Sequence, residues 1–451
     1  MVILCFCLCM MGALLLPVDK CPDEKGRRFL SGWVIRTGTL PTGDELPTML
    51  MSWVDESAPV LSIIPNSEED GWGFSYALRP YLSSIIAALC QKTAGLFTDS
   101  PRILLAASRM CSVLAVTLCC FFSLLLGHRL FRNRSAAGLF AAMICFLPQV
   151  MFLGMYQNND SLSLCAVIMI LYFITEGYDQ KWPVRTCIGL AFSFSLGLLS
   201  YYSIYGWLLL GLVFCVCIML TDLEIRDKRK LAGKRMALIT GLCLLLAGWF
   251  FLRNALLHEG DFLGIAYERQ SRAKMREMGY TLHEYKCYRD EGMSVREFLS
   301  FADAYWLRMS ARSFVGVFGY MDILMSSFGY TVYGAWFAVG LTLYIAAILR
   351  RRPCRRDQQI ALLMFSASVL TVLLHFWQSY TRDFQPQGRY VITLIIPLAY
   401  LFSAGTDKLI LPVFPSKEKK SDVMNPAVIL TGTWLMMFAA VAVGTMSKMI
   451  L

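Results

Sequence analysis

Residues 21–45 read CPDEKGRRFLSGWVIRTGTLPTGDE, and they follow directly on an apolar run that begins at the first residue. An acidic pair, Asp23 and Glu24, opens this stretch, and Lys25, Arg27 and Arg28 come next. Such an abrupt change from apolar to charged sequence is typical of a helix that leaves a lipid bilayer. The stretch therefore raises two questions: how many such helices the chain contains, and what the acidic pair does at the end of the first one.

The composition is that of a membrane protein. The chain has 451 residues, of which 57% are hydrophobic and 16% charged, and its mean hydropathy is +0.53. These values lie outside the range of soluble domains. The net charge of +10 does not indicate nucleic-acid binding, because the basic residues gather in short loops between apolar runs. The sixteen cysteines lie mostly in apolar runs, without metal-ligand or disulfide spacing, so we interpret them as small buried hydrophobic residues.

The apolar runs predict an all-α polytopic membrane protein. A helix needs ~20 apolar residues to span a bilayer. The run at 187–221 is too long for one helix and contains SYYSIYG, so we expect two helices that turn there. The first run lacks a basic start and a cleavage site and is expected to be retained. About eleven transmembrane helices result, from runs at about 2–18, 103–127, 135–154, 160–177, 187–221, 236–253, 328–349, 359–377, 390–405 and 427–448.

The short loops set the expected orientation. Five of them are basic and fall on the same side as the N-terminus, which the positive-inside rule makes cytoplasmic. They contain Arg129, Arg132 and Arg134; Lys181 and Arg185; Arg226 to Arg235; Arg350 to Arg356; and Lys408 to Lys420. We expect residues 1–405 to form one transmembrane module. Residues 406–451 are expected to form a cytoplasmic loop and the last helix.

Two long loops, at about 19–102 and 254–327, lie on the predicted outer face. The first mixes acidic and aromatic residues, and we expect both loops to be structured. The segment LRPYLSSIIAALCQKTAGLF, residues 78–97, is amphipathic at helical spacing. The soluble mass of the protein is therefore expected on the outer face, and the acidic pair lies there too.

Two outer-face stretches carry acidic or amide side chains suited to chemistry. A partly desolvated carboxylate at Asp23 or Glu24 is suited to act as a general base toward a hydroxyl or to bind a divalent cation. The alternative is that the pair only marks the helix end. The stretch YQNNDSLSL, residues 156–164, begins a helix that Asn159 or Asp160 can cap. The start of this helix offers amides to an anion or a sugar hydroxyl, or is merely capped.

Arginines at the outer boundary are candidate phosphate ligands. Arg253 ends a span, in GWFFLRNALLHEGDFLGI, with Asp261 shortly after it. It contacts either headgroups in general or one specific phosphate. Arg109 lies well inside the second span and needs a partner, either a phosphate or an acid such as Asp160.

Arg389 is the strongest of these candidates. It lies in RDFQPQGRYVITLIIPLAYLF, about one turn inside the apolar boundary, with Gln387 and Tyr390 beside it. Gly388 allows a close approach of another backbone. A guanidinium at this depth suits a lipid-linked phosphate, whose oxygens it can bind in pairs. The alternative is interfacial anchoring by Arg389 and Tyr390.

The order of these motifs resembles the GT-C superfamily of membrane glycosyltransferases, which includes the protein O-mannosyltransferases and the aminoarabinose transferase of lipid A. Within it, the chain resembles a bacterial family of predicted membrane proteins of unassigned function. The resemblance runs from about residue 18 to 405. It is carried by the acidic pair after the first helix, the long first loop, FLPQVMFLGMYQNNDSLSL, GWFFLRNALLHEGDFLG, SFVGVFGYMD and QGRYVITLIIPLAY.

The resemblance implies a fold, a reaction and site residues. It implies a GT-C-like fold and an inverting transfer of a sugar from a polyprenyl-phosphate donor to a hydroxyl on a lipid, glycan or wall polymer at the outer face. Asp23 becomes the catalytic base with Glu24 assisting. Arg389, Arg253 and Arg109 become ligands of the donor phosphate, and Asn159, Asp160, Gln387, Tyr390 and Asp261 become substrate-binding residues.

The cofactor and the functional class stay open at this stage. Many relatives follow the acidic pair with proline and histidine, whereas Lys25 and Gly26 follow it here, so we assign no metal ligand. The alternatives are no cofactor or a divalent cation, Mg²⁺ or Mn²⁺. A flippase for lipid-linked glycans, which would need ionisable residues along a transmembrane path, and a non-catalytic envelope scaffold are the alternative functions.

Overall fold

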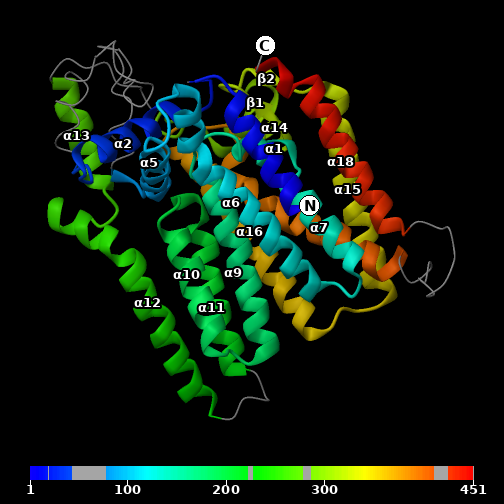
Figure 1. The fold of residues 1–451 in the computed structure, drawn as a ribbon. Helices are drawn as coiled ribbons and strands as arrows, with labels where there is room; N and C mark the ends of the chain where they lie inside the picture. The colour runs from blue at the N-terminus through cyan, green and yellow to red at the C-terminus, as the bar shows by residue number, and fades with distance from the viewer. Residues whose placement is uncertain (19, 43–77, 222–226, 278–285, 411–424, 450–451) are drawn as a thin grey trace.

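The computed structural model describes residues 1–18, 20–42, 78–221, 227–277, 286–410 and 425–449, which form a helical bundle (Figure 1). Within this part of the chain the strands are confined to one short antiparallel hairpin. Its strands are β1 (Val317–Phe318) and β2 (Ile323–Leu324). The all-α prediction is confirmed.

Eight helical segments in the described residues, each a single helix or a run of consecutive helices, are long and apolar enough to cross a membrane. The chain is therefore a multi-pass membrane protein. These spans are α6 (Pro101–Leu130), α9 (Asp160–Gln180), η2 (Tyr202–Ile204) with α11 (Tyr205–Thr221), α12 (Lys228–Leu257), α15 (Ser327–Arg350), α16 (Arg355–Thr381), η3 (Gly388–Leu394) with α17 (Ile395–Gly405) and η4 (Thr406–Ile410), and α18 (Pro426–Gly444) with η5 (Met446–Met449).

Three shorter apolar helices occupy the remaining predicted runs: α1 (Val2–Leu15), α7 (Arg134–Cys145) and α10 (Val184–Leu198). A count of eleven membrane crossings stays a prediction for these three. The turn predicted in SYYSIYG is confirmed, since α10 ends at Leu198 and α11 begins at Tyr205.

The run at 135–154 was predicted as a single helix, and this was wrong. Helix α7 ends at Cys145, and a separate short helix, α8 (Pro148–Leu153), follows. Pro148 explains the break, because a proline cannot donate the backbone hydrogen bond that would continue the helix and favours the first position of a new one. Residues 139–154, on both sides of the break, are buried.

Four helices lie at one end of the bundle, beyond the spans: α2 (Glu24–Thr37), α5 (Leu82–Ala94), α13 (Ile265–Glu277) and α14 (Val295–Val315) (Figure 1). They belong to the two long loops, so the prediction that these loops are structured is confirmed where they are described. Helix α5 matches the predicted amphipathic segment at 78–97. The acidic and aromatic residues at 43–77 lie outside the described residues.

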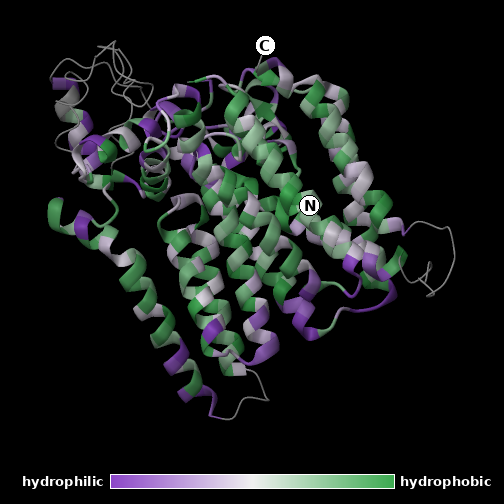
Figure 2. Ribbon diagram, viewed as in Figure 1, coloured by the Kyte–Doolittle hydropathy of each residue, from purple (hydrophilic) through white to green (hydrophobic). Residues whose placement is uncertain are grey.

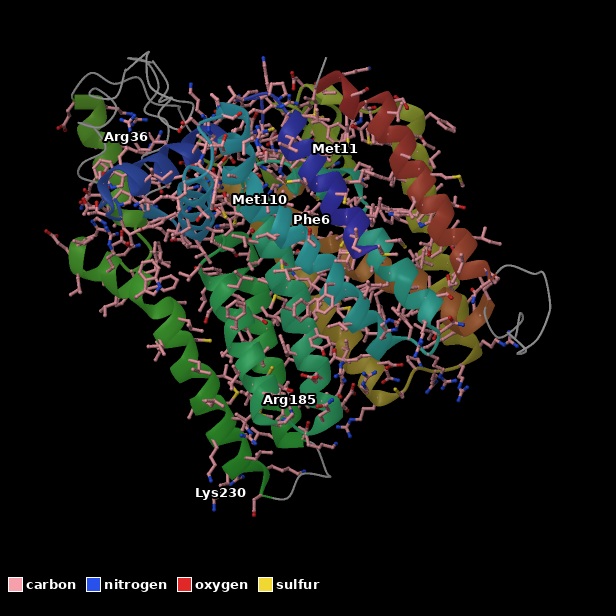
Figure 3. All side chains as sticks on the ribbon, in the orientation of Figure 1. Phe6, Met11, Arg36, Met110, Arg185 and Lys230 are labelled. Carbon is pink, nitrogen blue, oxygen red and sulfur yellow. The ribbon has the colours of Figure 1, made fainter. Side chains whose placement is uncertain are left out.

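The predicted basic loops meet at the opposite end of the bundle. Polar residues gather there in Figure 2, and Arg185 and Lys230 lie there in Figure 3, far from Arg36. Arg356 contacts Asp179 at 2.6 Å and Arg129 contacts Glu176 at 2.8 Å, which joins α16, α9 and α6. The described residues of these loops thus lie on one side of the bundle, whereas Arg226, Lys417, Lys419 and Lys420 lie outside the described residues. The cytoplasmic location stays a prediction.

Candidate active site

The acidic pair lies at the start of α2, a few residues after α1 ends. Asp23 is the residue before the helix and has a left-handed backbone, with φ 62°. Aspartate tolerates this conformation better than most residues. The consequence is that the two neighbouring carboxylates contact different arginines, Asp23 contacting Arg389 and Glu24 contacting Arg109.

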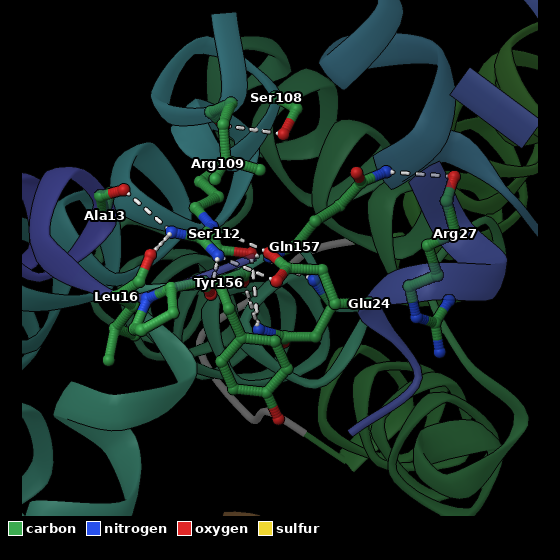
Figure 4. A network of polar contacts seen from close by, with 12 residues as sticks. Ala13, Leu16, Glu24, Arg27, Ser108, Arg109, Ser112, Tyr156 and Gln157 are labelled. Atoms are coloured by element: carbon green, nitrogen blue, oxygen red, sulfur yellow. Dashed lines mark hydrogen bonds and ion pairs between the residues drawn. The ribbon is translucent and has the colours of Figure 1, made fainter. Parts of the chain in front are cut away.

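Glu24 and Arg109 form a fully buried ion pair (Figure 4). Arg109 donates from Nε to Glu24 Oε1 at 2.7 Å and from Nη2 to Oε2 at 2.8 Å. Its other N–H groups donate to the backbone carbonyls of Ala13, Leu16 and Pro17 at 2.7–3.0 Å. All five guanidinium donors therefore have protein acceptors. The pair ties α6 to the end of α1 and the start of α2, which is a structural role.

The segment before α9 packs on this ion pair. The backbone N–H of Gln157 donates to Glu24 Oε1 at 3.2 Å, and its side-chain amide donates to Ser31 Oγ at 2.9 Å (Figure 4). Tyr156 is buried just before it, and its hydroxyl has no hydrogen-bond partner among the described residues. Burial raises the pKa of Tyr156, so this hydroxyl stays protonated.

Asn159 is the N-cap residue of α9, as predicted, but its side chain makes no capping hydrogen bond. The side chain of the preceding Asn158 does so instead, since its Oδ1 accepts from the backbone N–H of Ser161 at 2.9 Å. Asn159 instead donates to the carbonyls of Pro80 and Ser200 at 3.0 and 2.8 Å, and it accepts from Ser83. These contacts join α5, α9 and the end of α10, so the Asn159 amide is occupied by protein groups.

Asp23 and Arg389 form the second ion pair, at 2.7 Å between Oδ2 and Nη2. The Arg389 side chain is 5% exposed and that of Asp23 is 20% exposed. Nη2 of Arg389 also donates to the hydroxyl of Tyr390 at 3.2 Å. Nε and Nη1 are buried and have no hydrogen-bond partner in the described part of the chain. Unpaired N–H groups in a buried guanidinium are costly unless a ligand or water takes them.

Asp160 lies at the same centre, as the first residue of α9, and is 4% exposed. Its charge interacts with those of Arg389, Arg27 and Asp23. No protein group among the described residues donates a hydrogen bond to its carboxylate. Arg27 is also buried, at 4% exposure. The centre thus combines two carboxylates with two guanidinium groups, an arrangement suited to a ligand that carries both an anion and hydroxyl groups.

Gly388 places Arg389 against α14. Its backbone N–H donates to Ser313 Oγ at 2.6 Å. A Cβ atom at Gly388 would overlap the backbone nitrogen of Phe314. The expected close approach of another backbone is confirmed. Gln387 lies beside it and donates to Gln385 at 2.6 Å, while its own buried Oε1 has no hydrogen-bond partner among the described residues.

The remaining predicted residues, Arg253 and Asp261, have other partners. Arg253 donates to the carbonyls of Leu40 and Pro41 at 2.9 and 2.8 Å and contacts the Tyr81 hydroxyl at 3.3 Å. Asp261 accepts from the backbone N–H of Tyr267 at 2.9 Å. The contacts described for Asp23 and Arg389 include neither Arg253 nor Asp261.

The described residues beside Asp23 and Glu24 do not provide a set of ligands for a divalent cation. Within the described ranges there is no group of three or more His, Cys, Asp or Glu side chains that could hold a metal ion. Glu24 is wholly occupied by Arg109, and Asp23 contacts a guanidinium. Positive charge beside Asp23 is supplied by Arg389, and a cation placed there would be repelled by it.

The sequence reasoning missed several contributors to this centre. Tyr156, Gln157 and Asn158 lie within the quoted YQNNDSLSL segment or directly beside it, but nothing in their spacing told their roles apart. The SYYSIYG stretch predicts a turn, but nothing in it indicates that the ring of Tyr201 lies beside that of Tyr390.

The family model of predicted membrane proteins known as DUF2142 matches residues 65–399. The chain belongs to this family. Among curated protein sequences none matches the chain.

Two solved structures are similar to the DUF2142 chain. ArnT from Cupriavidus metallidurans, bound to undecaprenyl phosphate, is similar with a TM-score of 0.52 and 14% identity over 98% of this chain and 70% of ArnT. The oligosaccharyltransferase AglB from Archaeoglobus fulgidus, in complex with an inhibitory peptide and a dolichol-phosphate, has a TM-score of 0.48 and 11% identity. That match covers 97% of this chain but 55% of AglB. The likeness to ArnT confirms the expected GT-C-like fold.

Proposed function

We propose that this DUF2142 protein is an inverting glycosyltransferase that moves a sugar from a polyprenyl phosphate to a hydroxyl acceptor at the outer face of the membrane. The observation that carries the proposal is the Asp23–Arg389 ion pair, in which a partly exposed carboxylate adjoins a buried guanidinium with unpaired N–H groups. The GT-C-like fold supports it, and so does the undecaprenyl phosphate named with ArnT.

Arg389 binds the donor phosphate in this proposal. Its Nε–H and Nη1–H₂ groups are buried and free of other described hydrogen-bond partners, and charge-assisted hydrogen bonds to phosphate are among the strongest that proteins make. Nη2 of Arg389 keeps its contact with Asp23, so the same guanidinium contacts both the catalytic base and the leaving phosphate. Arg27 adds a second buried positive charge near Asp160.

Asp23 acts as the general base. Its carboxylate takes the proton from the acceptor hydroxyl, whose oxygen forms a new bond to the anomeric carbon of the sugar. The bond from that carbon to the phosphate oxygen breaks at the same time, and its electron pair leaves with the polyprenyl phosphate. The base and the leaving group lie on opposite faces of the sugar, so the anomeric configuration inverts. Arg389 stabilises the negative charge that develops on the leaving phosphate.

The other predicted residues receive narrower roles. Asp160 accepts hydrogen bonds from hydroxyl groups of the substrate, because its buried carboxylate has no such donors in the described part of the protein. Glu24 and Arg109 are left out of the reaction, since they satisfy each other. Arg253 and Asp261 hold outer segments together. No step uses a metal ion.

The spread of charged groups favours a transferase over a flippase. The described ion pairs fall into two sets, one at the outer end and one among the basic loops. A flippase would need ionisable groups along the path between them.

The acceptor in this proposal is a lipid, a glycan or a wall polymer, and the other partners are membrane lipids.

The test is transfer of radiolabelled sugar by the purified protein in lipid vesicles, with a panel of polyprenyl-phosphate sugars as donors. Asp23→Asn removes the base but keeps the size of the side chain, so transfer should fall by about 10²–10⁴-fold. Asp290→Asn is the matched control, because it removes an exposed carboxylate that pairs with Arg289 and has no part in the proposed reaction, and it should keep wild-type transfer.

A second readout separates catalysis from binding. Binding of undecaprenyl phosphate should persist in Asp23→Asn and weaken in Arg389→Gln, which keeps a polar side chain but loses the charge. Equal transfer by wild type and Asp23→Asn would remove Asp23 from the mechanism. Absence of transfer and of lipid binding in the wild type would reject the transferase.

A further inference from the structure

The turn between α10 and α11 holds Tyr201 beside the candidate active site. Tyr201 has an extended backbone, and the residue before it is fixed by Asn159, which donates to the Ser200 carbonyl at 2.8 Å, and by Ser163, whose hydroxyl lies 3.1 Å from that of Ser200. Tyr205 closes the turn by donating to the Leu198 carbonyl at 2.8 Å. The position of Tyr201 is therefore set by α9 and α10.

The ring of Tyr201 is nearly parallel to that of Tyr390. Their centroids are 6.1 Å apart and their planes differ by 14°. On the Tyr390 side, the guanidinium carbon of Arg389 lies 5.1 Å from the ring centroid. Both tyrosines are partly exposed, whereas Arg389 and Asp160 are buried. An aromatic surface thus borders the buried charged centre and stays accessible beside it.

We propose that Tyr201 and Tyr390 form an aromatic wall that binds the sugar of the donor. The inference rests on the proposed function and adds the part of the site that recognises the sugar. A sugar ring presents an apolar face of C–H groups, which packs on the electron-rich face of an aromatic ring, while its hydroxyl groups point sideways to polar partners. Asp160 supplies such a polar partner at the same centre.

The distances agree with this placement. A phosphate oxygen lies about 2.8 Å from the nitrogen that binds it. The sugar is bonded directly to that phosphate, so a donor held by Arg389 carries its sugar within reach of a ring whose centroid is 5.1 Å from the guanidinium carbon. Tyr201 adds a second, nearly parallel ring, with its centroid 6.1 Å from that of Tyr390.

The other two tyrosines of the turn, Tyr202 and Tyr205, donate hydrogen bonds to backbone carbonyls. Tyr202 donates to the Leu263 carbonyl at 2.9 Å, and Tyr205 donates to Leu198. Their rings meet edge to face at 5.1 Å. These two side chains hold the turn together, and Tyr201 faces Tyr390. Tyr201 is therefore a specificity-determining residue: it discriminates a sugar-bearing donor from the bare lipid phosphate.

The test measures binding of two kinds of lipid to the protein in nanodiscs. One probe is undecaprenyl phosphate, and the others are undecaprenyl-phosphate glucose, mannose, galactose and arabinose. The measured quantity is the ratio of the two affinities, because general damage to the protein lowers both together. We expect the wild type to bind at least one sugar-bearing lipid more tightly than undecaprenyl phosphate. Tyr201→Ala should reduce this preference about three- to tenfold and leave the affinity for undecaprenyl phosphate unchanged.

Two further variants make the result specific. Tyr201→Phe keeps the ring and should keep the wild-type preference. Tyr202→Ala alters the same turn without touching the wall and should also keep the preference. A wild type that binds all the lipids equally, or a Tyr201→Ala protein that keeps the preference, would overturn the aromatic wall and leave the transferase standing. A wild type that does not bind undecaprenyl phosphate would reject the proposed function itself.

Discussion

The buried Glu24–Arg109 pair gives the sharpest prediction about stability. Both side chains are fully buried, and Arg109 joins Glu24 to three carbonyls at the end of α1. Replacing Glu24 by glutamine keeps the shape but removes the charge that balances Arg109. Breaking one side of a buried ion pair costs about 3–5 kcal/mol, because the other charge is left uncompensated. We expect Glu24→Gln to lose that much of its free energy of unfolding.

Arg109→Met should cost more than Glu24→Gln. It leaves the Glu24 carboxylate unpaired, and it also leaves the carbonyls of Ala13, Leu16 and Pro17 without their donor, at about 1 kcal/mol each. The expected loss is roughly 6–8 kcal/mol. The double variant should be more stable than Arg109→Met alone, because it contains no uncompensated charge and the new amide at position 24 can donate to one of the freed carbonyls.

The assay is unfolding of the purified protein in mixed micelles, with increasing sodium dodecyl sulfate, followed by far-ultraviolet circular dichroism. Asp290→Asn is the matched control, because Asp290 pairs with Arg289 at the surface, where an ion pair contributes little. Strong coupling between the two substitutions is the central expectation. Additive losses in the double variant would refute the reasoning, and so would a Glu24→Gln protein that unfolds at the same detergent fraction as the wild type.

Other predictions concern packing, pH and orientation. Gly388→Ala should destabilise the protein by at least about 1–3 kcal/mol and abolish transfer, because the added Cβ overlaps the Phe314 backbone; the same unfolding assay checks this. Burial raises the pKa of Tyr81 to about 12 from 10.0, so the unfolded chain loses the Tyr81 proton at a lower pH than the folded chain. The free energy of unfolding therefore falls as the pH rises between these two values. Tyr81→Phe should reduce that fall, measured in thermal melts at increasing pH. A membrane-impermeant maleimide should label Thr39→Cys in intact cells and label the exposed Cys354 only after permeabilisation, whereas the reverse pattern would invert the orientation.

Much of the fold follows from local sequence. Apolar runs of bilayer length became helices because each must satisfy its own backbone hydrogen bonds in lipid. The SYYSIYG turn was predictable from the length of its run. Pro148 itself indicates the helix break, but the apolar run around it still predicts one continuous helix.

The pairing of charges was not predictable. Arg109 needed a partner, but Asp160 and a phosphate were as reasonable as Glu24 from sequence. The choice depends on how α6 packs against the end of α1 and the start of α2, which is a tertiary property. Asn158 and Asn159 show the same limit, since two identical neighbours take different roles because only one of them faces the backbone of Ser161.

The two neighbouring carboxylates of the opening stretch contact different arginines because of the backbone at Asp23. Asp23 takes a left-handed backbone at the start of α2, so it contacts Arg389 while Glu24 is fixed on Arg109. Glu24 therefore acts as an anchor one residue away from the proposed base, and the rigidity of that anchor determines how closely Asp23 is held to Arg389. Glu24→Gln should for this reason lower transfer even in micelles where the fold survives, whereas undecaprenyl phosphate should still bind, because the unpaired N–H groups of Arg389 remain in place.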